Sequence, residues 1–218
     1  FLILVLGASV SDTIQNLVGE TYYTGDGAEE TALAFITGGI LAAILWNLIT
    51  WKFGIPASSS HSLIGGVVGA GLAAFGTGAI AWHYFWGRVV LMIFLTPAVS
   101  FCLGFCILKL LLRLTRCAGV GVNKFFTYAQ WVNMTFLAFN HSFNDSQKSI
   151  GILLILLGIY GGHILEIPLW AISCAAVCLA CGIAFGGFKI IKTVGTGIYK
   201  VQPIHSFASQ LTAGSVIL

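Results

Sequence analysis

Long apolar runs alternate with short polar segments along this chain. Runs without an Asp, Glu, Lys or Arg residue cover residues 1–11, 31–51, 53–87, 89–108 and 167–188. A helix needs about 20 apolar residues to cross the hydrocarbon core of a bilayer. The pattern therefore predicts helical spans over residues 1–18, 31–51, 88–112 and 168–188. It also predicts a loop over 76–87 with an interfacial aromatic belt, and a less regular crossing in each of 54–75 and 125–165.

The two less regular segments carry polar residues inside apolar sequence. Pro56 and three consecutive serines interrupt the first, and glycines crowd its second half, which favours a helical hairpin or a discontinuous span. The second is long for one crossing and has the polar stretch 140–149 at its centre, which favours a broken or partly re-entrant helix. We expect an all-α integral membrane protein, a multi-span bundle with discontinuous helices.

The composition agrees with a membrane protein and excludes several other classes. Hydrophobic residues make up 58% of the chain and charged residues 8%, whereas a soluble domain carries roughly 25% charged residues. The net charge of +3 comes without a basic stripe or an aromatic reading surface, so we expect no nucleic-acid partner. The 27 glycines suit close helix packing in lipid.

Cysteines recur at helical spacing in two apolar runs. Cys102 and Cys106 lie one turn apart, and Cys174, Cys178 and Cys181 follow the same spacing. We interpret them as small apolar side chains and expect no metal site.

Charged residues between the spans predict the orientation of the chain. Arg113, Arg116 and Lys124 form a short basic segment, which the positive-inside rule assigns to the cytoplasm. A second basic loop is predicted at Lys189, Lys192 and Lys200. The acidic loop over 19–30 then lies outside.

Two polar clusters fall at the predicted membrane depth. The first contains Ser58, Ser59, Ser60 and His61, and the second contains Asn140, His141, Asn144, Asp145, Gln147 and Lys148. Serine hydroxyls and free N–H groups at a helix start suit an anion. Asn and Asp oxygens suit a sodium ion or a proton beside that anion.

Structural interpretations compete with these functional ones. Ser60 alone would serve as an N-cap for a helix beginning near His61. Asp145 and Lys148 have the i,i+3 spacing of a simple ion pair. Gly65 with Gly69, and Gly66 with Ala70, form small-xxx-small pairs that indicate packing faces.

Three segments resemble one transporter family. GIPASSSHSLIGGVVGAG (54–71) is similar to a proline-serine signature of the PiT family of inorganic phosphate transporters. LAFNHSFNDSQKSIGILLILL (137–157) resembles the family's Asn-Asp signature, and 193–218 resembles the stretch leading toward its last signature. Two motifs in the expected order make the resemblance specific.

The resemblance implies two inverted repeats, each with an Asn-Asp element followed by a proline-serine element. Residues 1–124 would be the later part of the first repeat and residues 125–218 the early part of the second, both in one membrane domain. The first Asn-Asp element and the second proline-serine element are not found in the chain. We therefore expect the chain to be a central portion of a longer transporter.

The resemblance also implies roles for individual residues. Ser58, Ser59, Ser60, Asn144 and Asp145 would bind phosphate, and Asn144, Asp145 and Gln147 would bind the coupling ion; roles for His61, His141 and Lys148 stay open. Three positions depart from the family pattern. Ser142 replaces a glycine, Asn140 replaces a small residue, and Lys148 stands where many members carry Asn. A lysine ammonium there could replace a cation, so Na⁺ and H⁺ both stay open as coupling ions.

We interpret the chain as part of a multi-pass transporter of the inner (plasma) membrane, not an enzyme. It would move inorganic phosphate, alone or as a metal–phosphate complex, by alternating access driven by a Na⁺ or H⁺ gradient. Its partners would be the substrate and the lipid bilayer, with a homo-oligomer left open; no resident cofactor is expected. The alternatives are transport of sulfate or another tetrahedral oxyanion, a membrane-embedded Ser/His hydrolase, and a phosphate sensor that does not transport.

Overall fold

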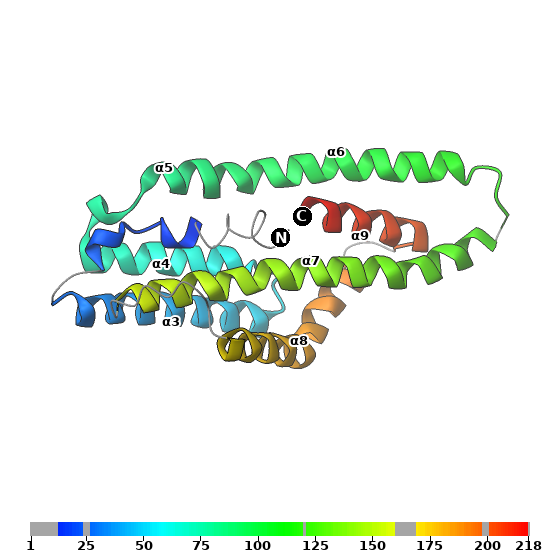
Figure 1. Ribbon diagram of the computed structural model, residues 1–218. Coiled ribbons are helices and arrows are strands. Elements are labelled where there is room, and N and C mark those ends of the chain that lie inside the picture. The colour runs from blue at the N-terminus through cyan, green and yellow to red at the C-terminus, as the bar shows by residue number, and fades with distance from the viewer. Residues whose placement is uncertain (1–12, 24–26, 120, 160–168, 198–200, 218) are drawn as a thin grey trace. The chain divides into compact units, whose positions relative to one another are not determined.

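The protein is helical throughout the part that the structure describes. The computed structural model describes all residues except 1–12, 24–26, 120, 160–168, 198–200 and 218 (Figure 1). The longer helices are α3 (Glu29–Phe53), α4 (Ser59–Phe75), α6 (Leu91–Leu114), α7 (Gly121–Ile159), α8 (Leu169–Gly197) and α9 (Pro203–Ile217). Short turns are η1 (Glu20–Tyr22), η2 (Thr77–Ala79), α5 (Trp82–Tyr84) and η3 (Phe85–Val90). The predicted all-helical class is confirmed, and in the described ranges extended pairing is limited to a bridge between Val18 and Ile80.

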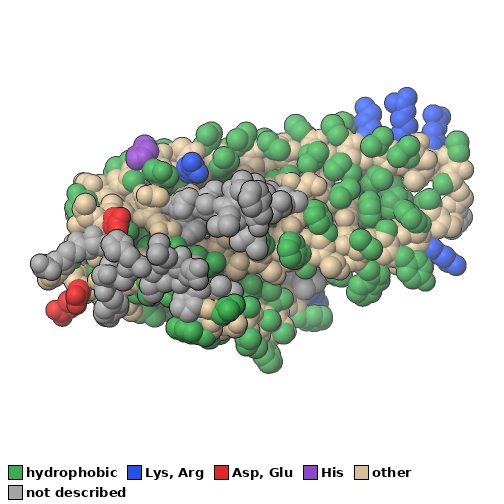
Figure 2. Space-filling view, viewed as in Figure 1, with side chains coloured by type: hydrophobic (Ala, Val, Ile, Leu, Met, Phe, Trp, Pro, Cys, Tyr) green, Lys and Arg blue, Asp and Glu red, His purple; other side chains and the backbone are tan. Residues whose placement is uncertain are grey.

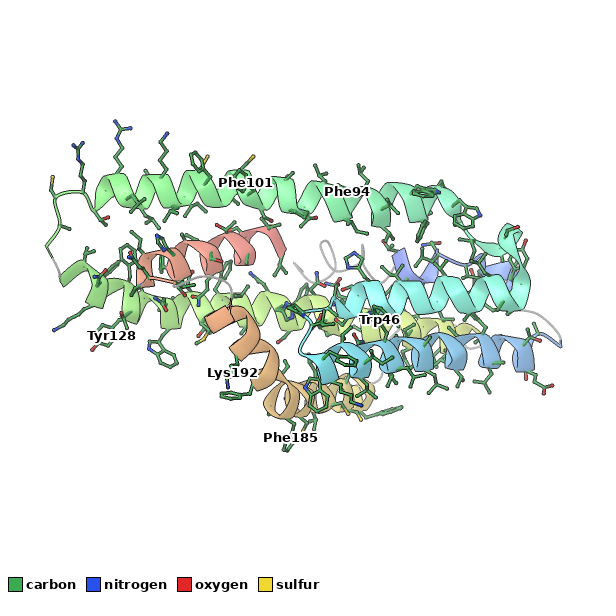
Figure 3. The ribbon with its side chains drawn as sticks, turned by 180° about the vertical axis from the view of Figure 1, so that it is seen from behind. Trp46, Phe94, Phe101, Tyr128, Phe185 and Lys192 are labelled. Carbon is green, nitrogen blue, oxygen red and sulfur yellow. The ribbon has the colours of Figure 1, made fainter. Side chains whose placement is uncertain are left out.

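Several helices have the length and surface of membrane spans. Among the described residues, α3 and the continuous helical stretch Trp82–Leu114 are long and apolar enough to cross a bilayer, and α4 and Ser173–Phe188 are shorter apolar helices. Large apolar side chains point outward from these helices, including Trp46, Phe94 and Phe101 (Figure 3). Phe101 is 74% exposed. A water-facing surface would not carry side chains of this kind in such number, whereas a lipid-facing surface requires them.

The chain divides into two compact units. Unit 1 contains Phe1–Arg88 and Ser146–Ile198, and unit 2 contains Val89–Asp145 and Tyr199–Leu218. Each unit is described by itself below. The predicted repeat boundary between residues 124 and 125 is a different division and stays a prediction.

In unit 1, α3 and α4 form a helical hairpin, whereas the hairpin or discontinuous span predicted within 54–75 is a short non-helical segment followed by the single helix α4. Gly54 ends α3 in the left-handed conformation, with φ of 68°, and a short segment through Pro56 leads into α4. The two helices touch at Gly39 and Gly66, where a methyl group on Gly66 would overlap the carbonyl oxygen of Gly39. Glycine at both positions therefore lets the two backbones approach directly.

An aromatic cluster closes one end of this hairpin. The rings of Phe35 and Phe75 meet edge to face with centroids 5.4 Å apart, and Tyr23 stacks on Phe35 at 6.2 Å. At the other end, the indole N–H of Trp51 donates a hydrogen bond of 3.1 Å to the carbonyl of Gly186 in α8.

In unit 2, α9 packs against α6 and is hydrogen-bonded to α7. Phe126 of α7 and Phe207 of α9 have ring centroids 5.3 Å apart. Gly104 of α6 lies against Thr212 of α9, whose hydroxyl donates a 2.7 Å hydrogen bond to the carbonyl of Ala208 in its own helix.

Three local predictions differ from the structure. The segment 140–149 lies within the continuous helix α7, so the predicted break does not occur there. The predicted loop 76–87 is already helical from Trp82, because the largely aromatic residues 82–86 extend the apolar helix α6 backward. Lys189 and Lys192 lie inside α8 rather than in a loop. Lys200, residues 1–12 of the predicted first span and residues 160–165 lie outside the described residues.

Candidate functional site

The predicted serine cluster stands at the start of α4. Ser58 is the N-cap: its backbone is extended, and its hydroxyl oxygen accepts a hydrogen bond of 3.4 Å from the N–H of His61. The helix therefore begins at Ser59, and the prediction that Ser60 is the N-cap is wrong by two residues. The Ser58 hydroxyl thus accepts a hydrogen bond from one of the N–H groups that the first turn leaves unpaired. Ser59 and Ser60 lie within that turn.

A fourth serine extends the cluster and was missed by the sequence analysis. Ser62 donates to the carbonyl of Ser58 at 2.9 Å and lies 3.0 Å from Oδ1 of Asn47 in α3. Asn47 thus links the last turns of α3 to the first turn of α4. The polar side chain of Asn47 in a largely apolar helix was the one sequence signal that could have identified this contact.

The serines are accessible. Ser58, Ser59 and His61 are exposed, and Ser60 and Ser62 are half-buried. Hydroxyls and N–H groups at a helix start, with the positive end of the helix dipole behind them, form a surface that favours an anion.

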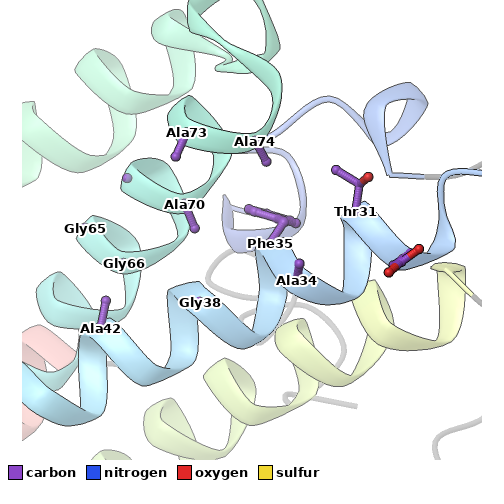
Figure 4. A pocket seen from close by; sticks show the side chains of 12 residues that line it. Thr31, Ala34, Phe35, Gly38, Ala42, Gly65, Gly66, Ala70, Ala73 and Ala74 are labelled. Atoms are coloured by element: carbon purple, nitrogen blue, oxygen red, sulfur yellow. The ribbon is translucent and has the colours of Figure 1, made fainter.

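A groove along the same hairpin has different chemistry. It encloses about 660 Å³ between α3 and α4, and its wall is built mainly from Gly and Ala, including Gly65, Gly69 and Ala70 (Figure 4). Of the predicted packing pairs, Gly66 makes the backbone contact with Gly39. A Cβ atom added at Gly65 or Gly69 would meet no atom of the described residues within 4 Å. The groove has an apolar wall, so its chemistry does not suit a phosphate.

The second predicted cluster follows α7 through its middle turns. His141 Nε2 lies 3.4 Å from Oδ2 of Asp145, one helical turn away. The His141 side chain is 59% exposed and the Asp145 side chain 14%. Because Asn144 is half-buried beside them, this turn of α7 presents a carboxylate, an imidazole and an amide.

The next turn is more deeply buried. Gln147 is 6% exposed and Lys148 9% exposed. Within the described part of the chain, no hydrogen-bond donor reaches Oε1 of Gln147. Buried amide oxygens are almost always paired in native proteins, so this oxygen is available to a bound ion or water.

The departures from the family pattern have structural explanations at two positions. Asn140 is 5% exposed, and its side-chain amide donates a hydrogen bond of 3.0 Å to the carbonyl of Gly214 in α9. Ser142 is exposed and helical, and among the described residues only glycines have positive φ. Ser142 therefore needs no glycine-like backbone.

Two further amides, which the sequence analysis missed, repeat the Asn140 contact along α7. Gln130 donates to the carbonyl of Pro203 at 3.0 Å and Asn133 to that of Phe207 at 2.9 Å. We call Gln130, Asn133 and Asn140 the amide ladder. The three lie on one face of α7, because their spacing follows the helical repeat.

The predicted site residues thus belong to two separately described parts. The serines lie in unit 1, and Asn140, His141, Asn144 and Asp145 lie in unit 2, with Gln147 and Lys148 just beyond the boundary in unit 1. The structure groups Ser58 with Ser62 and Asn47, and Asp145 with His141.

Comparisons with known proteins identify the family of the chain. A family model described as the phosphate transporter family matches residues 2–120 and 117–218. A probable low-affinity inorganic phosphate transporter of Bacillus subtilis is 34% identical over 224 residues, covering 96% of this chain and 67% of the relative. A protein of the same description from Rhizobium meliloti is 36% identical, covering 84% of this chain and 55% of the relative. The low-affinity inorganic phosphate transporter PitB of Escherichia coli is 36% identical, covering 73% of this chain and 36% of the relative.

The fold also has a counterpart among solved structures. A structure described as "The sodium-dependent phosphate transporter" aligns over 98% of this chain and 73% of that chain, with a TM-score of 0.73 and 17% identity. At this identity the likeness establishes the fold. The chain spans about two thirds of the Bacillus protein and about half of the Rhizobium protein. These relatives are named as transporters rather than enzymes, which argues against the hydrolase alternative. With matches that together cover nearly its entire length, the chain belongs to the phosphate transporter family.

Proposed function

We propose that the protein containing this chain moves inorganic phosphate across the membrane by alternating access, driven by a Na⁺ or H⁺ gradient. The family match carries the proposal, because relatives that match most of the chain are named as probable inorganic phosphate transporters. The site residues support it chemically: a serine-rich helix start for an anion, and a carboxylate-amide turn for a cation.

The depth of the α7 cluster supports a transport role. Tyr128 and Trp131 are 73% and 67% exposed near the start of α7, where amphipathic aromatic rings mark a membrane–water interface. Half of the hydrocarbon core is about 15 Å, and a helix rises about 1.5 Å per residue. The bilayer centre then falls about ten residues beyond Trp131, at the beginning of the cluster that contains His141 and Asp145. Transporter sites typically lie at this depth.

We propose the following division of roles. Ser58, Ser59 and Ser60 bind phosphate oxygens through hydroxyl and N–H groups, with Asn144 and Asp145 contributing from α7. Asn144, Asp145 and Gln147 bind the coupling ion, for which the buried Oε1 of Gln147 supplies an oxygen that accepts no hydrogen bond from the described residues. Oxygen atoms of this kind suit hard cations such as Na⁺.

Residues 1–124 and 125–218 would then be parts of two inverted repeats that contribute these elements to one membrane domain. In this proposal the hairpin α3–α4 carries the proline-serine element of the first repeat, and the central turns of α7 carry the Asn-Asp element of the second. Sequences outside this chain would supply the matching elements.

Labelled phosphate uptake into proteoliposomes tests the proposal. The full-length protein is assayed with a Na⁺ gradient, with an H⁺ gradient and with neither, beside Asp145→Asn and the control Glu29→Gln. Glu29 is an exposed carboxylate in the first turn of α3. We expect uptake to require one gradient, to collapse in Asp145→Asn and to survive in Glu29→Gln.

Two other outcomes would redirect the assignment. Sulfate that competes with labelled phosphate at equal concentration would assign a broader oxyanion substrate. A folded protein that binds phosphate but transports none under any gradient would overturn the transport proposal in favour of a sensor.

A further inference from the structure

A group of basic side chains surrounds the connection between α6 and α7. Lys109, Arg113, Arg116 and Lys124, which we call the basic cluster, are all exposed. Figure 2 shows Lys and Arg side chains gathered where α6 ends. Lys109 and Arg113 lie on one face of α6 at a spacing of four residues, and Arg116 follows in the turn directly after the helix, so three cations lie close together at the end of α6.

Unit 2 supplies little acid to neutralise these cations. In the sequence of unit 2, Asp145 is the one acidic residue, and it is ion-paired with His141. Four exposed cations within sixteen positions therefore attract an anionic partner from outside the unit.

The surface leading to the basic cluster is apolar and exposed. The twenty positions of α6 and η3 between Arg88 and Lys109 contain no Asp, Glu, Lys or Arg, and the most apolar window of Trp82–Leu114 buries none of its residues. Leu95 is 44% exposed and Phe105 57%. This length matches one hydrocarbon core, so the basic cluster falls at its boundary.

One contact and the exposure of neighbouring aromatic residues place the cations at the level of lipid headgroups. The ammonium of Lys109 lies 5.6 Å from the ring centroid of Phe105, which puts one charge against the last of the apolar surface. On α7, the aromatic side chains of Phe125 and Tyr128 are 63% and 73% exposed close to Lys124 in sequence. Cations beside exposed aromatic residues are typical of the interfacial layer.

We propose that the basic cluster binds the headgroup phosphates of anionic phospholipids, whose acyl chains lie along the exposed apolar face of α6. Separate, exposed cations around the end of α6 suit several lipid phosphates in a plane. A single free phosphate would instead require converging donors in an enclosed pocket. The proposal is independent of the transport mechanism.

Lipid titration of the full-length protein tests this site. The protein is purified in a nonionic detergent, and binding of dioleoyl phosphatidylglycerol and dioleoyl phosphatidylcholine is measured by native mass spectrometry. The test variant is Arg113→Gln with Arg116→Gln, and the matched control is Lys52→Gln with Arg88→Gln, which removes two cations elsewhere. Each cation near an anionic surface contributes roughly fivefold in affinity. We expect the test variant to bind phosphatidylglycerol on the order of 20-fold more weakly, with the control and phosphatidylcholine binding unchanged.

Further measurements distinguish the lipid from other causes. Arg113→Lys with Arg116→Lys retains the charges and should retain phosphatidylglycerol binding, and thermal unfolding in lipid-free detergent checks that all variants are folded. If the double Gln variant does not fold, Lys109→Gln and Lys124→Gln replace it, each with an expected loss of roughly fivefold. Equal binding of the two lipids, unchanged binding in the Gln variants, or displacement of phosphatidylglycerol by millimolar inorganic phosphate would overturn the proposal.

Discussion

The side-chain amide of Asn140 donates a hydrogen bond of 3.0 Å to the main-chain carbonyl of Gly214. With Gln130 and Asn133, it holds α9 against the half of α7 that leads into the candidate site. Gly214 permits this approach, because a methyl group there would lie 2.7 Å from the ring of Phe136. A polar residue in the predicted site cluster is therefore part of the helix packing.

Replacing Asn140 should weaken this packing. We expect Asn140→Leu to lower the free energy of unfolding by about 1 kcal/mol, since interhelical hydrogen bonds in membranes contribute about 0.6 kcal/mol on average and up to about 1.7. Urea or thermal unfolding of the full-length protein in detergent measures this. Thr135→Val is the control, because the Thr135 hydroxyl bonds to Trp131 in its own helix. An equal loss of unfolding free energy in Asn140→Leu and Thr135→Val would show that the hydrogen bond to α9 contributes no more than one within α7.

The contact between α3 and α4 should tolerate no added carbon. In Gly66→Ala the new methyl group meets the backbone of Gly39, which cannot rotate away, so we expect a loss of about 2–3 kcal/mol or failure to fold. Gly65→Ala is the matched control, as a Cβ there has nothing within 4 Å. It should be neutral or stabilising by up to about 1 kcal/mol, because alanine favours helix more than glycine. Similar thermal midpoints for the two variants would contradict the close contact.

Ser58 and Ser59, both proposed to bind phosphate, should differ in their effect on stability. Ser58→Ala removes the N-cap and should cost about 1 kcal/mol of stability. Ser59→Ala should leave the thermal midpoint nearly unchanged and raise the KM for phosphate, because its hydroxyl is exposed within the first turn of α4. Unfolding and uptake measured on both variants decide this. A stable Ser59→Ala variant with normal KM would remove Ser59 from the phosphate site.

Replacing Gln147 should maintain or raise stability without ions and should reduce the stabilisation by the coupling cation. Leucine fills a similar volume and removes a buried oxygen without a described donor, so Gln147→Leu should equal or exceed the parent in stability without ions. The Gln147→Leu variant should also lose the stabilisation by the coupling cation, because a cation stabilises the protein only by binding to its folded state. Thermal unfolding with and without Na⁺ measures both effects. An unchanged response to Na⁺ would remove Gln147 from the ion site.

The sequence predicted the helices where local signals are strong. Uninterrupted apolar runs located α3 and α6, and Pro56 with the serines after it indicated a non-helical segment before α4. The start of the helical stretch Trp82–Leu114 was placed too late, since Trp82, Tyr84 and Trp86 were interpreted as a belt in a loop. Aromatic residues at an interface are compatible with both a loop and a helix.

Other features depend on contacts between distant segments and could not be read from local pattern. Polar residues in the middle of α7 suggested a break, yet the helix continues because side chains rather than backbone groups carry the polarity. The role of Asn140 required knowledge of α9, which lies far along the sequence. The burial of Gln147 and Lys148 likewise could not be predicted from the i,i+3 spacing of Asp145 and Lys148.

The pairing of Gly39 with Gly66 also sets an order of assembly. These glycines lie on consecutive helices, so the hairpin that carries the serines closes a short loop and can form as soon as α4 has been inserted. The hydrogen bond between Asn140 and Gly214 spans 74 positions and must wait for α9 to leave the ribosome. During biosynthesis, the serine-bearing hairpin is thus complete while α7 still lacks its hydrogen-bonding partner.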